Sequence, residues 1–317
     1  MGFKRVFAIG VVTVLISAAW AGVQGHLEDD ERTSAGSGPA TAGIEAEDAA
    51  GGAGGITGPS GYEYPGPKAD FPTGPKRLAP ELEGLRAALV EDIEYWIAEG
   101  TPRNRTAKAV ALGALRDQRI ARHLNSHPGT MRKIVRTIGG RLGAAIRRNY
   151  KAGHALSVLS TPVKKVPDWK IYAAAPPHQL LRFYEKAEER FGVKWYYLAS
   201  VNLIESRMGR IKGPSSSGAQ GPMQFMPATW DAYGGGGDIN DPHDSIIAAG
   251  RYLHASGAPG DMRPALYSYN RSWAYVKAIT TYARAMKADP ENFYVYYYWQ
   301  VFVRTTKGDV QMTGPGT

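Results

Sequence analysis

Apolar side chains recur every three or four residues from Glu81 onward, which is the spacing of a helix with one buried face. The positions are Leu82, Leu85, Leu89, Ile93, Trp96 and Ile97. Gly100 follows where such a helix would end, and Thr101 with Pro102 resembles the start of another. The pattern predicts one helix from Glu81 to Gly100 and a second from Thr101 to about Asn125.

A third apolar stripe runs from Met131 to Ile146, weakened by Gly139 and Gly140. We predict that the three helices form an antiparallel module over residues 81–160. Residues 161–177 contain four prolines and interrupt the periodicity, which indicates a Pro-rich linker.

Helical periodicity returns after this linker and ends at Gly192. The stretch "KWYYLASVNLIESRMG" that follows is apolar on nearly all sides, as expected of a helix in the middle of a domain. The fold class is therefore predicted to be mainly α, with a domain over residues 178–306. Near its end, "ENFYVYYYWQVFVRTTKG" is interpreted as core packing, either as one helix or as a helix and a short strand over 301–304. Residues 307–317 are interpreted as a tail.

The beginning of the chain has the pattern of an export signal. Lys4 and Arg5 precede a long apolar run, and Ala19-Trp20-Ala21 has the small residues that a signal peptidase requires. Residues 1–25 are predicted to be a signal peptide or a retained membrane anchor, and the protein is expected to be exported. Residues 26–80, rich in Gly, Ala, Pro and acids, are predicted to be a disordered linker.

Charge is distributed unevenly along the chain. Residues 101–165 hold fifteen Lys or Arg and the single acid Asp117, a net charge of +14, whereas the whole chain of 317 residues has +9. Such an imbalance favours a polyanionic partner over a simply solvated surface. We expect anionic wall polymers, acidic glycans or lipid headgroups, and no nucleic acid, because no motif for nucleic acid is present.

Glu205 is the only glutamate between Arg190 and Pro290. On a helix its carboxyl would share a face with Leu198 and Val201, among which the ionised form is disfavoured and the pKa rises. A carboxyl of this kind can act as a general acid near neutral pH. The alternative is a structural glutamate that is satisfied by backbone donors or by an arginine such as Arg207 or Arg210.

The residues after this glutamate carry a more specific signal. The sequence has Glu-Ser at 205–206, then "SSSGAQGPMQFMPATW" from Ser215, and later "LYSYN" ending at Asn270. The set resembles the lytic transglycosylase SLT domain of bacterial cell walls, over about residues 178–288. The resemblance implies a lysozyme-like fold. It departs from the family pattern at Pro222, where leucine is usual, and at Ser268, where alanine is usual.

The resemblance implies that Glu205 is the catalytic acid and base. The residues that it implies for substrate binding are Ser206, Ser215, Met223, Gln224, Tyr269 and Asn270. In this family one glutamate cleaves the MurNAc-β-1,4-GlcNAc bond of peptidoglycan and leaves a 1,6-anhydroMurNAc end. Ordinary glycosidases need two carboxyls. The alternatives are a lysozyme-type hydrolase that uses Asp231, Asp238, Asp241 or Asp244, a non-catalytic wall-binding protein, and a polyanion-binding scaffold.

The stretch "GGGGDINDPHD" offers several oxygen ligands for calcium. It lacks the spacing and the terminal glutamate of an EF-hand, so we interpret it as a turn in which Asp241 caps a helix. The chain has no cysteine, and no H-E-x-x-H pattern is present. We expect neither a cofactor nor an essential metal, and the sequence does not predict an oligomeric state.

Overall fold

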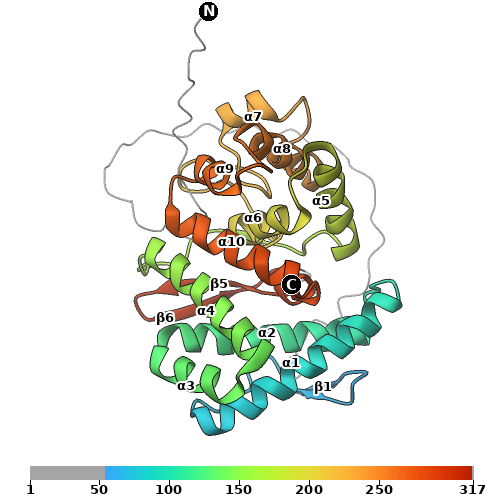
Figure 1. Cartoon of the computed structure of the whole chain (residues 1–317), viewed down its shortest axis with the longest axis vertical. Helices are drawn as coiled ribbons and strands as arrows, with labels where there is room; N and C mark the ends of the chain where they lie inside the picture. The colour runs from blue at the N-terminus through green and yellow to red at the C-terminus, as the bar shows by residue number, and fades with distance from the viewer. Residues whose placement is uncertain (1–53, 316–317) are drawn as a thin grey trace, which may run out of the picture.

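The structure is a computed structural model that describes residues 54–315, and this part of the chain is mainly helical, as predicted (Figure 1). Its helices are α1 (Pro75–Ala98), α2 (Arg105–Ser126), α3 (Pro128–Ile138), α4 (Gly140–Leu159), α5 (Pro177–Phe191), α6 (Trp195–Ser206), α7 (Pro227–Tyr233), α8 (Pro242–Ala255), α9 (Met262–Tyr269), α10 (Trp273–Ala288) and α11 (Glu291–Tyr297). Three antiparallel strand pairs accompany them: β1 (Ile56–Thr57) with β2 (Glu63–Tyr64), β3 (Lys170–Ile171) with β4 (Ile211–Lys212), and β5 (Val301–Thr305) with β6 (Gly308–Met312).

Helix α6 lies in the middle of the second half of the chain, among α5, α8 and α10 (Figure 1). Every residue from Leu198 to Ser206 is buried, so the helix has no solvated face over these turns. This agrees with the prediction from its apolar sequence. The helix ends at Arg207, which adopts a left-handed conformation with φ of 56°. Glu205 is therefore held one residue before the end of a helix that is packed on all sides.

Helices α1–α4 differ from the predicted module in three places. The second helix begins at Arg105 after a cap by Asn104, and not at Thr101 as predicted. The first helix begins at Pro75, before the predicted Glu81, and it contains Pro80. Leu78 and Ala79 are buried, and their packing offsets the backbone hydrogen bond that the proline removes. The predicted third helix is broken in two at Gly139, whose φ of 63° no continuous helix can include.

The basic helices and the second half of the chain share one continuous hydrophobic core. Helix α4 packs along α10, and the Tyr296 hydroxyl donates a buried hydrogen bond to Asn149 Oδ1 at 2.5 Å. Gln118 exchanges two hydrogen bonds of 2.8 Å with the backbone of Gln300. The predicted division between residues 81–160 and 178–306 thus separates segments that are packed together.

The predicted linker over 26–80 is wrong for the part that the structure describes. Residues 54–80 form the β1–β2 pair and the start of α1. Tyr64 is completely buried, and its hydroxyl donates to Asp92 Oδ2 at 2.6 Å. One buried ring and a side-chain hydrogen bond order this segment, although it has no apolar period. Residues 26–53 lie outside the described part, as does the predicted signal or anchor over 1–25.

The other two predicted irregular segments are also tied to the fold. The Pro-rich linker over 161–177 contributes β3, which pairs with β4, and Val163 forms a bridge with Thr305. The predicted tail over 307–317 contains β6, so the end of the chain is a hairpin and not a free tail. The strand β5 follows α11, so the interpretation of this region as a helix and a short strand is confirmed, and the interpretation as one helix is not. Among the described residues, no helix is both long enough and apolar enough to cross a membrane.

The aromatic cluster near the C-terminus packs into the core, as predicted. Tyr296 is fully buried, and Phe293, Tyr297 and Trp299 are buried with it. Their rings meet edge to face, for example Tyr282 against Tyr296 with centroids 5.2 Å apart. These aromatic residues therefore form part of the core between α10 and α11.

Candidate active site

Glu205 occupies the position that its sequence context predicted. Its side chain is 2% exposed, and Val201 and Leu198, one and two turns earlier on α6, are fully buried. One hydrogen bond reaches the carboxyl from another helix, because the Tyr275 hydroxyl of α10 donates to Glu205 Oε1 at 2.7 Å. The carboxyl is thus fixed between two packed helices.

Burial raises the pKa of Glu205 to about 8, and the hydrogen bond from Tyr275 lowers that pKa by a smaller amount. Transfer out of water disfavours the charged form, and one hydrogen bond only partly compensates for this. At neutral pH the carboxyl is mainly protonated. It can donate a proton in conditions where an exposed glutamate would already be ionised.

Neither of the two arginines that could have neutralised Glu205 does so. Arg207 follows the end of α6 in a left-handed conformation, and Arg210 lies with its guanidinium 4.8 Å from the centre of the Tyr297 ring. No ion pair joins either arginine to Glu205 in the part of the chain that the structure describes. The alternative of a structural, arginine-paired glutamate is therefore wrong.

Ser206 does not face a substrate, contrary to the expectation from the resemblance. It is fully buried, its hydroxyl donates to the carbonyl of Pro222 at 2.5 Å, and it accepts from the Gly209 amide at 2.9 Å. These bonds tie the end of α6 to the loop that carries Gln224. We assign Ser206 a positioning role, because both directions of its hydroxyl are used inside the protein.

The loop from Ser215 to Gly221 is shaped by its own hydrogen bonds. Ser215 Oγ accepts from the Ala219 amide at 3.0 Å, and Gly218 has a φ of 83°. At Gly221 a side chain is impossible, because an added Cβ would lie 1.8 Å from the Ile239 carbonyl oxygen. Ser215 is buried, so its substrate contact stays a prediction while its role in the turn is visible.

Met223 and Gln224 lie where the loop approaches α9. Met223 is fully buried, and its carbonyl accepts from the Tyr269 hydroxyl at 2.6 Å. Gln224 has a φ of 51°, and its Nε2 donates to the Gly221 carbonyl at 2.8 Å. The Oε1 atom of Gln224 is buried and has no hydrogen-bond partner within the described residues. A buried acceptor of this kind needs a donor, and a sugar hydroxyl could supply one.

Tyr269 is the last residue of helix α9 and Asn270 follows as its C-cap, and Tyr269 lies near the glutamate in space. The charge of Glu205 is among the influences that raise the pKa of Tyr269, after burial. Asn270 is buried at the helix end. The residue that the sequence did not reveal is Tyr275, the direct partner of Glu205. The start of a helix at Ser272, which caps the Tyr275 amide at 3.4 Å, was the signal that could have located it.

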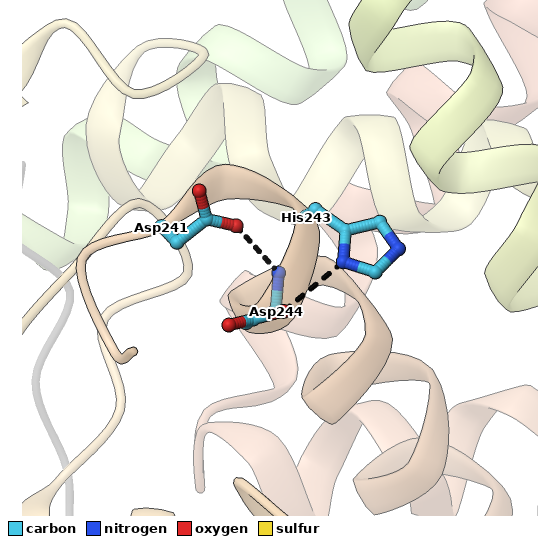
Figure 2. Close-up of side chains that lie close together, drawn as sticks. All are labelled: Asp241, His243 and Asp244. Carbon is cyan, nitrogen blue, oxygen red and sulfur yellow. Dashed lines mark hydrogen bonds and ion pairs between the residues drawn. The ribbon is translucent and has the colours of Figure 1, made fainter. Parts of the chain in front are cut away.

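The aspartates that a hydrolase could use as a second carboxyl belong mostly to one capping turn. Asp241 Oδ1 accepts from the Asp244 amide at 3.0 Å, and His243 Nδ1 lies 3.0 Å from Asp244 Oδ1 (Figure 2). Asp238 accepts from the Asn240 amide at 2.8 Å. The capping role of Asp241 is confirmed. Asp241, His243 and Asp244 come close enough to resemble a metal site. Within the turn, Asp241 Oδ1 and both carboxylate oxygens of Asp244 already take part in hydrogen bonds.

Comparison with known proteins gave one family. Residues 182–291 match the family model described as "Transglycosylase SLT domain", which spans α6, the loop with Gln224 and helices α7–α10. The matched segment contains Glu205 and Tyr275 together with the other residues of the candidate site. Comparison with curated proteins and with solved structures gave no match.

Proposed function

We propose that this protein, whose residues 182–291 match the model of the transglycosylase SLT domain family, is an exported lytic transglycosylase. It cleaves the MurNAc-β-1,4-GlcNAc bond of peptidoglycan and forms 1,6-anhydroMurNAc ends. The observation that carries the proposal is the buried carboxyl of Glu205, whose raised pKa keeps it protonated at neutral pH.

The reaction needs one group that first gives and then takes a proton. Protonated Glu205 donates its proton to the glycosidic oxygen, the bond from that oxygen to C1 of MurNAc breaks, and positive charge develops on the sugar ring. The carboxylate then removes the proton from the MurNAc 6-hydroxyl as its oxygen bonds to C1. No water is consumed, and Glu205 ends protonated as it began.

Tyr275 supports both halves of this cycle. Its hydroxyl donates to Oε1, which leaves Oε2 as the oxygen that can carry the catalytic proton. The same hydrogen bond stabilises the carboxylate that forms after the first proton transfer. Tyr275 is thus proposed to hold the carboxyl in one orientation and to limit the cost of its ionisation.

A hydrolase that uses a second carboxyl is the weaker alternative. Asp238, Asp241 and Asp244 are used by the turn at the start of α8, and Asp231 is exposed on α7. The influences that shift the pKa of Glu205 are burial and Tyr275, with no carboxylate among them. A non-catalytic wall-binding protein is disfavoured because it has no need to keep a carboxylic acid buried at this energetic cost.

Export and a polyanionic partner remain part of the proposal. Lys4 and Arg5 before an apolar run support export, with the segment either removed or kept as an anchor. Several cations of the basic helices are neutralised within the fold, for example Arg116 by Glu81 and Arg148 by Asp289. The remaining positive charge is proposed to hold the enzyme on anionic wall polymers or lipid headgroups.

The test is mass analysis of the sugars released from purified peptidoglycan. The wild type should release muropeptides that end in 1,6-anhydroMurNAc and are lighter by one water than hydrolysis products. Glu205→Gln should reduce the rate by about a hundredfold to ten-thousandfold. Asp231→Asn, which also removes a carboxyl, is the matched control and should cleave normally. Reducing-end products from the wild type would make the protein a hydrolase.

A further inference from the structure

A polar cavity of about 380 Å³ lies between the basic helices and the catalytic half of the chain, and the proposed reaction does not use it. Helices α2 and α4, α10 and the β5–β6 hairpin surround it, and Figure 1 shows these elements side by side. Its lining includes Arg122, Asn125, Arg207, Tyr282, Phe302 and Arg304. The cavity therefore combines cationic and amide groups with aromatic walls.

Arg207 is the residue that the fold leaves unexplained. Its side chain is 6% exposed, and its Nε has no hydrogen-bond partner. Burial, opposed by Tyr282 and assisted by the nearby cations Arg122 and Arg210, lowers its pKa to about 10, so it is still charged at neutral pH. No carboxylate of the described residues pairs with it. A buried cation without an anion is costly, and the cost is removed when an anion binds.

The charges around the cavity favour a doubly charged ligand. Arg122 is paired with Asp309 at 2.5 Å and lies over the Phe302 ring, so these two charges cancel. Arg304 is exposed at the rim, and it has no ion-pair partner in the described part of the chain. Arg207 and Arg304 together leave two positive charges. A phosphate monoester carries about −1.5 to −2 charges at pH 7, and guanidinium groups bind it in a bidentate manner.

A second unsatisfied atom indicates what else the ligand carries. Asn125 Oδ1, in the lining of the same cavity, is a buried acceptor without a partner. An anionic oxygen cannot satisfy an acceptor, whereas a hydroxyl can. We propose that this cavity binds a small phosphorylated polyol, with its phosphate on Arg207 and Arg304 and a hydroxyl donated to Asn125.

The test is isothermal titration calorimetry of the full chain at constant ionic strength with glycerol 3-phosphate, inorganic phosphate and acetate. The wild type should bind glycerol 3-phosphate saturably, inorganic phosphate more weakly because it has no polyol hydroxyl to donate to Asn125, and acetate not at all. Arg207→Met should weaken the binding of glycerol 3-phosphate at least tenfold, as expected for the loss of a charged hydrogen bond. Arg284→Gln removes an exposed arginine elsewhere and should bind as the wild type does.

Two further measurements separate a ligand site from a structural arginine. Without ligand, Arg207→Met should melt at the same or a higher temperature than the wild type, because it removes an unpaired buried charge. A lower melting temperature together with unchanged ligand binding would overturn the proposal. Arg304→Gln, at the exposed rim, should also weaken binding while the fold is kept. Saturable binding of acetate in place of phosphate, or no binding of any anion, would refute the ligand class.

Discussion

Replacement of Glu205 by glutamine should make the protein more stable at neutral pH while it abolishes cleavage. Glutamine has nearly the same shape, and its amide oxygen can still accept the Tyr275 hydroxyl in place of Oε1. What it removes is an ionisable group that the fold keeps protonated. An unfolded chain ionises Glu205 freely, so the wild type loses stability wherever only its unfolded state is charged.

The magnitude follows from the two pKa values. In the unfolded chain the pKa is near the ordinary value of 4.5, and in the folded protein burial raises it to about 8. Between these values the native state binds more protons than the unfolded state, so stability falls as pH rises through this window. At 1.36 kcal/mol per pKa unit, the loss at pH 7 is about 3 kcal/mol and at pH 4 almost nothing. Glu205→Gln does not lose this stability, because glutamine does not ionise.

The assay is denaturant and thermal unfolding of both proteins at pH 4 and pH 7. Glu205→Gln should unfold at the same midpoint as the wild type at pH 4. At pH 7 it should be more stable by about 3 kcal/mol, or by roughly 4–6 °C in Tm for a chain of this length. Asp231→Asn, on the surface, should show no such pH-dependent gain. A Gln variant that is less stable at pH 7 would mean that Glu205 is ionised and paired in the native state, and would refute the general-acid assignment.

Two further predictions concern the catalytic partner and the basic helices. Tyr275→Phe removes the hydrogen bond that lowers the pKa of Glu205. The alkaline limb of the kcat/KM profile, expected near pH 8 in the wild type, should therefore move to higher pH, and the rate should fall. An alkaline limb that does not move would show that Tyr275 does not influence the proton donor. Binding to walls that carry anionic polymers should weaken steeply with added salt, whereas turnover of short uncharged glycans should hardly change, and equal salt sensitivity of both would exclude a polyanion role for residues 101–165.

The sequence predicted the centre of the candidate site better than its surroundings. The burial of Glu205 could be predicted because its helix is apolar on all sides. A carboxyl on such a helix has almost no solvated face on which it could lie. The helix start at Ser272 could have located Tyr275, but its contact with Glu205 could not be predicted, because this contact joins residues 70 positions apart and depends on how α6 and α10 pack. Ser206 was assigned to the substrate for a related reason: its partner, the Pro222 carbonyl, is a backbone group without a sequence signature.

The segments predicted to be irregular are also ordered by long-range contacts that the sequence does not reveal. Residues 54–80 have no apolar period, and what orders them is one tyrosine in contact with a distant aspartate, Asp92. The strand pairs β1–β2 and β3–β4 are two residues long on each side, too short for an alternating pattern to appear. The break at Gly139 was indicated by the glycine pair, but only the positive φ decides that the helix ends there.

The shared core predicts that the catalytic half cannot be isolated by deletion of residues 81–165. Such a deletion would expose the face of α10 that α4 covers, and it would remove Asn149 from the fully buried Tyr296. The single change Asn149→Ala should already cost about 1–3 kcal/mol, because it leaves a buried hydroxyl without a partner. The deleted chain should then show no cooperative melting transition in circular dichroism and little soluble yield, with its loss of activity a consequence of unfolding. Lys277→Ala, an exposed change on α10, should melt as the wild type does. A deleted chain that melts cooperatively and still cleaves glycan would show that residues 178–306 fold alone, and that the basic helices are an attachment and not half of the core.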